Sequence, residues 1–259
     1  MSEKATIANS LSKTHFSSYI DDMATIGLYD SGIGGLTTLK ILLEKFKGND
    51  FFYLADNASH PFGTKSAKDL EEIVSSAVAT LKNNCDYPVL ACNTASSIYK
   101  DNDAIKLLPP LPPKNADLNE WLLMATDLTR ESASKAFKNV AETSDLASMI
   151  EVQASINSKQ GTLDMRALLP YLANSVFKFK GVKNVVLGCS HYPLCKKEIS
   201  KILGDVQFFD GNEIVLNALG KYVSPLNDES KITFRFTGGN EEKKYRKILS
   251  ILLAEQNKN

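Results

Sequence analysis

Two cysteines follow apolar runs in this chain, and the pattern around them favours a chemical role for both thiols. Each run ends in a thiol followed by polar side chains, which are Cys92, Asn93 and Thr94 in the first and Cys189, Ser190 and His191 in the second. A free cysteine most often packs as a small hydrophobic residue, so a core position is the alternative for either thiol taken alone. Because the pattern occurs twice, we predict two thiols that face one site.

An apolar run that ends in polar residues is typical of a buried parallel strand whose C-terminal end faces a ligand crevice. After the first run, Asn93 or Thr94 could cap a following helix, whose free N–H groups would attract an anion. A thiol at Cys92 would then be shifted toward the thiolate.

A third strand end carries a carboxylate. The predicted strand 25–29 is followed by Asp30, Ser31 and a glycine-rich turn, and then by a helix that we expect over 36–46. The glycines do not match the spacing of a dinucleotide-binding loop, and no phosphate-binding Gly-Lys-Ser/Thr follows. Asp30 suits an ammonium group or a proton-transfer partner. The alternative is that Asp30 or Ser31 only caps the helix.

The loop after the predicted strand 50–56 contains Pro61, Phe62 and Gly63. A Pro-Phe-Gly turn exposes backbone N–H groups, which could bind a carboxylate. An ordinary surface turn is an equally good interpretation of this loop.

The composition bounds the class of protein. The chain has 259 residues, 43% of them hydrophobic, with 30 basic and 30 acidic residues. We therefore expect no nucleic-acid partner and no membrane association. The four cysteines lack CxxC spacing, so we predict no metal site and a reducing, cytoplasmic location. Residues 1–24 lack an apolar signal core and are expected to form a disordered extension.

Predicted strands and helices alternate through the chain, which indicates an α/β fold. We expect two similar lobes, each a mostly parallel sheet flanked by helices, with the active site in the cleft between them. The predicted first lobe comprises 25–105 plus 206–259, and the second 106–205. A helix is expected over 129–140, whereas 141–162 has no clear period.

Four segments resemble the glutamate racemase family of the cofactor-independent aspartate/glutamate racemase superfamily. In chain order they are Asp30-Ser31-Gly32-x-Gly34-Gly35-Leu36, Pro61-Phe62-Gly63-Thr64-Lys65-Ser66, Cys92-Asn93-Thr94-Ala95-Ser96 and Gly188-Cys189-Ser190-His191-Tyr192-Pro193-Leu194. The resemblance covers roughly residues 25–100 and 180–240, and it fades between about 101 and 180.

The resemblance implies interconversion of L- and D-glutamate without a cofactor, which would supply D-glutamate for peptidoglycan synthesis. It implies that Cys92 and Cys189 are the acid/base groups, assisted by Asp30 and His191 respectively. The implied substrate-binding residues are Ser31, Pro61, Phe62, Gly63, Asn93, Thr94, Thr126, Thr129 and Ser190. The chemistry fits independently, because a racemase needs one base on each face of a planar carbanion and a thiol can serve as base or acid.

The chain also departs from the family pattern. Ser190 replaces a usual Thr, and Phe62 replaces a usual Tyr. The family's second-lobe Glu is not located; Glu151 lies nearby, but the sequence does not define the register. Two alternatives stay open, namely an isomerase for aspartate or another small dicarboxylate, and a non-catalytic amino-acid-binding relative. The sequence also leaves open whether the protein is a homodimer.

Overall fold

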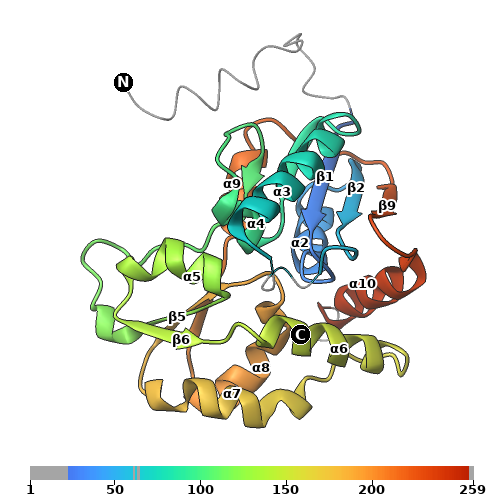
Figure 1. The fold of residues 1–259 in the computed structure, drawn as a ribbon. Coiled ribbons are helices and arrows are strands. Elements are labelled where there is room, and N and C mark those ends of the chain that lie inside the picture. Colours follow the sequence, from blue (N-terminus) through green and yellow to red (C-terminus); the bar gives the residue numbers. More distant parts are fainter. Residues whose placement is uncertain (1–22, 61, 63–64, 257–259) are drawn as a thin grey trace, which may run out of the picture.

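The computed structural model describes residues 23–60, 62 and 65–256, and it contains two separate sheets (Figure 1). The first sheet has the strand order β4-β3-β1-β2-β9 and the second β6-β5-β7-β8, and every pairing is parallel. We refer to each sheet with its flanking helices as the first and the second lobe. The expected α/β architecture is confirmed.

The bounds of the elements follow the chain. The strands are β1 (Thr25–Asp30), β2 (Asp50–Ala55), β3 (Tyr87–Leu90), β4 (Ile105–Lys106), β5 (Trp121–Ala125), β6 (Asn139–Glu142), β7 (Asn184–Gly188), β8 (Gln207–Phe209) and β9 (Ile232–Phe236). The α-helices are α2 (Leu36–Lys45), α3 (Ala67–Lys82), α4 (Asn93–Ile98), α5 (Asp127–Ala133), α6 (Leu146–Ser158), α7 (Leu169–Val176), α8 (Lys196–Leu203), α9 (Asn212–Leu219) and α10 (Glu242–Gln256).

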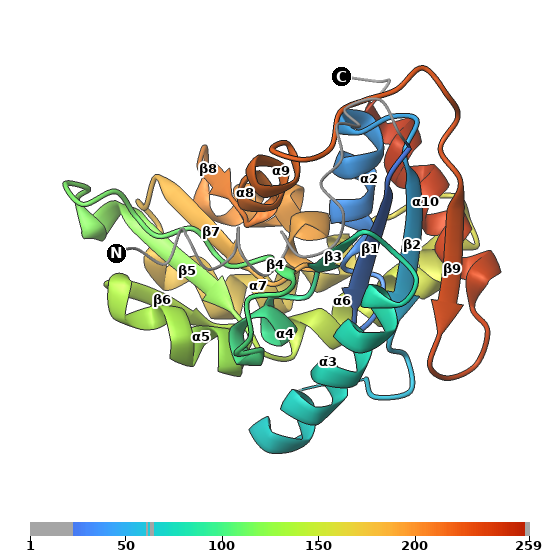
Figure 2. The same ribbon diagram turned by 90° about the horizontal axis from the view of Figure 1, so that it is seen from above.

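Side-chain alternation along β1 divides the first lobe into two layers. Ile26 and Leu28 face a core shared with α2 and α10, whereas Tyr29 faces a second core shared with α3. The views in Figures 1 and 2 place α3 on one side of this sheet and α2 with α10 on the other. With helices on both faces, the central strands are buried throughout and end at a single edge.

The two lobes pack against each other through a continuous core. The cluster that contains β1 and α2 also includes Met124 of β5, Ile150 of α6 and Leu187 of β7. Helix α10, which covers the first sheet, also packs on α6 of the second lobe. The chain crosses between the sheets twice, after β4 and after β8.

Several expectations about elements and domain bounds need correction or stay predictions. The helix expected over 129–140 is wrong in its second half, because α5 ends at Ala133 and β6 begins at Asn139. The segment without a clear period contains α6. The predicted start of the returning first lobe at 206 is too early, since β8 pairs with β7 in the second sheet. The division into two domains stays a prediction, and all but two residues of the 1–24 extension lie outside the described residues.

None of the helices in the described ranges is both long enough and apolar enough to cross a membrane.

Candidate active site

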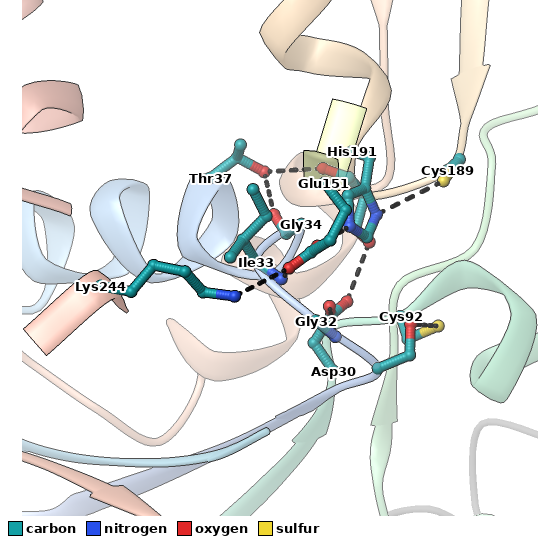
Figure 3. Close-up of polar contacts among 12 residues, drawn as sticks. Asp30, Gly32, Ile33, Gly34, Thr37, Cys92, Glu151, Cys189, His191 and Lys244 are labelled. Atoms are coloured by element: carbon teal, nitrogen blue, oxygen red, sulfur yellow. Dashed lines mark hydrogen bonds and ion pairs between the residues drawn. The ribbon is translucent and has the colours of Figure 1, made fainter. Parts of the chain in front are cut away.

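The candidate site lies where four strands end, two from each lobe. In the first lobe β1 ends at Asp30, and β3 is followed by Cys92. In the second lobe β5 is followed by Thr126, and β7 by Cys189. All four are inner strands of their sheets, so their carboxyl ends lie in the region where α/β folds bind ligands. Figure 3 shows side chains from both lobes meeting there.

Cys92 is placed by strand register. Tyr29 pairs with Leu90, so the residues two positions further on, Ser31 and Cys92, emerge side by side. The Ser31 Oγ lies 3.8 Å from the Cys92 Sγ. Cys92 occupies the N-cap position of α4, and its side chain is 5% exposed. The thiol is thus almost fully buried but has a polar neighbour.

The pKa of the Cys92 thiol is raised to about 12 by burial and by the Asp30 carboxylate, and the Ala95 amide and the Ser31 hydroxyl lower it only in part. The expectation that the α4 N-terminus shifts this thiol toward the thiolate is therefore wrong in this structure. The physical reason is that removing water from a charged sulfur outweighs the favourable contact with one helix-terminal N–H group.

Cys189 has a different neighbour. Its Sγ lies 3.9 Å from the Nδ1 of His191, and the opposite ring nitrogen, Nε2, lies 2.9 Å from the Oε2 of Glu151. Burial alone would lower the pKa of His191, but its contacts with Cys189 and Glu151 raise it well above the ordinary value. The imidazole is therefore held as a cation between a sulfur and a carboxylate.

Asp30 links the two lobes. Its Oδ1 accepts the N–H of Gly32 and its Oδ2 accepts the hydroxyl of Ser190, each at 2.8 Å. Burial raises the pKa of Asp30 to about 6, opposed by the charge of His191 and by these hydrogen bonds. Helix α2 has Gly35 at its N-cap, and this residue makes no side-chain capping bond. The backbone N–H of Gly35 also lowers the pKa of the Asp30 carboxyl, so the capping alternative for Asp30 stays a prediction.

Gly34 allows the lobes to approach closely at this point. A Cβ added at Gly34 would lie 2.4 Å from the Ser190 Oγ and 2.5 Å from the His191 Nδ1. A side chain there would clash with both residues, so the glycine keeps the backbone of the β1–α2 loop against the second lobe.

Hydroxyl groups from both lobes meet on the side of α4 and α5. The Oγ1 atoms of Thr94 and Thr126 are 2.9 Å apart, and the Thr126 hydroxyl donates to the Thr129 Oγ1 at 3.4 Å. The structure thus brings the Thr pair of the second lobe to the Cys92 motif of the first.

The side chains of two other predicted binding residues make contacts within the protein. The Asn93 side-chain amide donates to the Leu107 carbonyl at 2.9 Å, at the start of the connection to the second lobe. The Phe62 side chain is buried in the core beside α3. Pro61 and Gly63 lie outside the described residues. The roles of these four residues in substrate binding stay predictions.

The sequence did not locate Glu151 with certainty, and the structure places it beside His191. Its Oε2 also accepts the backbone N–H of Ile33 at 3.1 Å. Burial would raise the pKa of Glu151, but His191, the Ile33 amide and Lys244 lower it to about 2. In the sequence, the available signal for Glu151 is an acidic residue next to a buried position of α6.

The described residues contain no group of three or more His, Cys, Asp or Glu side chains suited to holding a metal ion.

Comparisons with known proteins give one answer. No protein-family model matches the chain. Glutamate racemase of Clostridium novyi is 34% identical over 206 residues, covering 72% of this chain and 78% of the relative. Glutamate racemase of Halothermothrix orenii is 29% identical over 248 residues, covering 88% and 98% respectively.

A solved structure, that of Escherichia coli glutamate racemase in complex with L-glutamate and the activator UDP-MurNAc-Ala, superposes with a TM-score of 0.66 at 22% identity. The match covers 90% of this chain and 95% of that one, and at this identity it shows the shared fold. The relative at 34% identity shows that the chain belongs to the glutamate racemase family of isomerases.

Proposed function

We propose that the chain interconverts L- and D-glutamate by a two-base mechanism in which Cys92 and Cys189 act on opposite faces of the α-carbon. The thiolate of one cysteine removes the α-proton, and the thiol of the other donates a proton to the opposite face of the planar carbanion. The number of protons on the enzyme is unchanged, and the two sulfurs exchange protonation states. No cofactor takes part in this scheme.

The observation that carries the proposal is the pair of buried thiols at facing strand ends of the two lobes, each beside polar groups. Their exposed fractions are 5% and 7%, so water has little access to either sulfur. Exclusion of water strengthens the electrostatic interactions that stabilise a carbanion and protects it from unwanted protonation.

The two thiols would reach the thiolate form by different routes. His191 supplies a cation beside Cys189. Cys92 has the Asp30 carboxylate nearby, and its raised pKa disfavours the thiolate. We infer that the α-ammonium group of glutamate binds near Asp30 and Ser31 and supplies the missing positive charge. Substrate binding would then activate Cys92.

The remaining predicted contacts would hold the two carboxylates of glutamate. The candidates are the side chains of Asn93, Thr94, Thr126, Thr129 and Ser190 and the backbone amides of Phe62 and Gly63. Pro61 has no N–H and would act only by fixing the turn that presents these amides. The D-glutamate formed would supply peptidoglycan synthesis. Four free cysteines suit a reducing cytoplasm as the location.

Proton exchange at the α-carbon tests the proposal. The purified chain, with no pyridoxal phosphate added, is incubated with L-glutamate in heavy water. We expect the circular dichroism signal of the amino acid to decay to zero while the α-proton resonance disappears. Aspartate and maleate serve as comparison substrates for the dicarboxylate alternative. Absence of exchange with glutamate, or faster turnover of aspartate or maleate, would contradict the proposal.

A further inference from the structure

Lys244 of α10 reaches the candidate site from the first lobe, although no sequence motif marks it. Its Nζ lies 3.5 Å from the Oε1 of Glu151 and 2.8 Å from the Oε1 of Glu241. Glu151 uses its other oxygen to contact His191. Figure 3 shows the resulting chain of contacts, which runs from Lys244 through Glu151 and His191 to the sulfur of Cys189.

Glu151 belongs to the second lobe, but two of its three partners belong to the first. Lys244 contacts one carboxylate oxygen, and the backbone N–H of Ile33 donates to the other. The loop that carries Ile33 presses closely on the carboxylate, since a Cβ added at Gly32 would lie 2.6 Å from the Glu151 Oε2. The position of Glu151 therefore depends on contact between the lobes.

The ion pair between Lys244 and Glu151 can orient the carboxylate as well as join α10 to α6. The side chains of Lys244 and Glu151 are 22% and 15% exposed, so water screens their interaction less than that of a surface pair. A carboxylate with two oxygens can rotate away from His191 unless its second oxygen is also held. Lys244 holds the second oxygen, which leaves the first directed at the imidazole.

We propose that Lys244 is a positioning residue for the Cys189 half of the reaction, so that closure of the lobes completes the acid/base group on that side only. This proposal rests on the two-thiol mechanism proposed above. The alternative is that Lys244 only stabilises the packing of α10 on α6.

Isotope effects distinguish the two roles. The Lys244→Met variant removes the charge but keeps the length of the side chain, and Lys244→Arg retains the charge. We expect Lys244→Met to lower kcat/KM by about three- to tenfold. The decrease must be equal in both directions, because the equilibrium constant between enantiomers is unity. Lys244→Arg keeps the charge, so its kcat/KM should stay within about twofold of wild type. This loss is smaller than the loss expected when the interaction with Glu151 is removed.

The asymmetry should appear in the primary deuterium isotope effect on kcat/KM, measured with α-deuterated L- and D-glutamate. If the step at Cys189 is slowed, the isotope effect rises for the enantiomer whose proton Cys189 removes. It falls for the other enantiomer, because reprotonation by Cys189 then limits the rate. Equal changes for both enantiomers, or an unchanged kcat/KM, would overturn the proposal.

Two further variants complete the design. Lys243→Met alters the neighbouring, exposed lysine and controls for the change in net charge; we expect wild-type rates. In a Glu151→Gln background, Lys244→Met should have no additional effect, because Lys244 acts through Glu151. A further loss of the same size in that background would indicate a purely structural role. Absence of α-proton exchange in the wild-type protein would instead refute the two-thiol mechanism itself.

Discussion

A buried thiol follows both β3 and β7, but the two thiols are surrounded by opposite charges. Cys92 has the Ser31 hydroxyl as its direct contact and the Asp30 carboxylate nearby. Cys189 has His191 as its contact, backed by Glu151. Each sulfur is buried to a similar degree, so the difference between the two sites is electrostatic rather than one of solvent access.

On the proposed two-base mechanism, this difference teaches that the two sides of the site need not be symmetric. The second lobe carries a cation for its own thiol, whereas the first lobe presents an anion, Asp30, that we propose binds the substrate's ammonium group. On this account the Cys189 side is prepared by the protein, and the Cys92 side is prepared by the substrate. Each of the following experiments perturbs one side of this comparison.

Removal of either sulfur should have the largest effect. We expect Cys92→Ala and Cys189→Ala each to lower kcat/KM for racemisation by at least about 10²–10⁴-fold, the usual contribution of a general acid/base group. Cys195→Ala is the matched control, because this cysteine is buried in the core beside α8. Chiral analysis of products measures the loss, and a full rate in either active-site variant would refute the two-base assignment.

Gly34→Ala should follow in size, because the added methyl group would displace Ser190 and His191. A displacement of about 1 Å in a catalytic group can lower the rate about 10²-fold. Gly239→Ala is the control, since an added Cβ there would meet no heavy atom within 4 Å. Wild-type kcat in both Gly34→Ala and Gly239→Ala would show that close contact of the lobes at the Gly34 loop does not matter for catalysis.

Glu151→Gln tests the Cys189 side alone. Loss of the carboxylate leaves His191 without its anionic partner, so its pKa should fall and the imidazolium should be less populated at neutral pH. We expect kcat to decrease about tenfold, the order of effect of losing a supporting partner of a functional group. The pH profile of kcat/KM should shift, whereas Val152→Ala, an exposed neighbour on α6, should leave it unchanged.

Asp30→Asn should affect activity and stability in opposite directions. Burial raises the pKa of Asp30 from 3.8 to about 6, so the folded state binds the proton more tightly than the unfolded chain does, although Asp30 is mostly ionised at pH 7. The contribution of Asp30 to the free energy of unfolding is complete below pH 3.8 and is lost as the pH rises through 6. At pH 7 we expect Asp30→Asn to raise the free energy of unfolding by about 1–3 kcal/mol.

The same variant should lower racemase activity, because it removes the anion expected to bind the α-ammonium group. Urea unfolding at pH 4 and pH 7 measures the effect on stability. The difference between variant and wild type should grow from the lower to the higher pH. A constant difference would indicate that the titration of Asp30 is not the cause.

Much of the fold and part of the site could be read from the sequence. The strands at 25–29, 88–91 and 185–188 were predictable because apolar runs ended in polar residues, and the alternating segment 232–237 contains β9 at the sheet edge. Helix α6 was missed because the exposed Val152 and Ile156 obscure its period. The contact between Glu151 and His191 joins positions 40 residues apart, so only tertiary packing reveals it.

The protonation state of Cys92 was also beyond the sequence. A helix N-terminus and a nearby carboxylate act on a thiol in opposite directions, and burial decides the balance. Local motifs identify which groups are present, whereas their charge depends on solvent exclusion by distant elements. Lys244 illustrates the same limit, because its helix meets Glu151 only when the two lobes pack together.

A crystal structure of the protein with D-glutamate bound would test the central claim most directly. The account predicts that the sulfurs of Cys92 and Cys189 lie on opposite faces of the α-carbon, each about 3–3.5 Å from it, with the ammonium group beside Asp30. Both sulfurs on one face, or glutamate bound out of reach of either thiol, would contradict it.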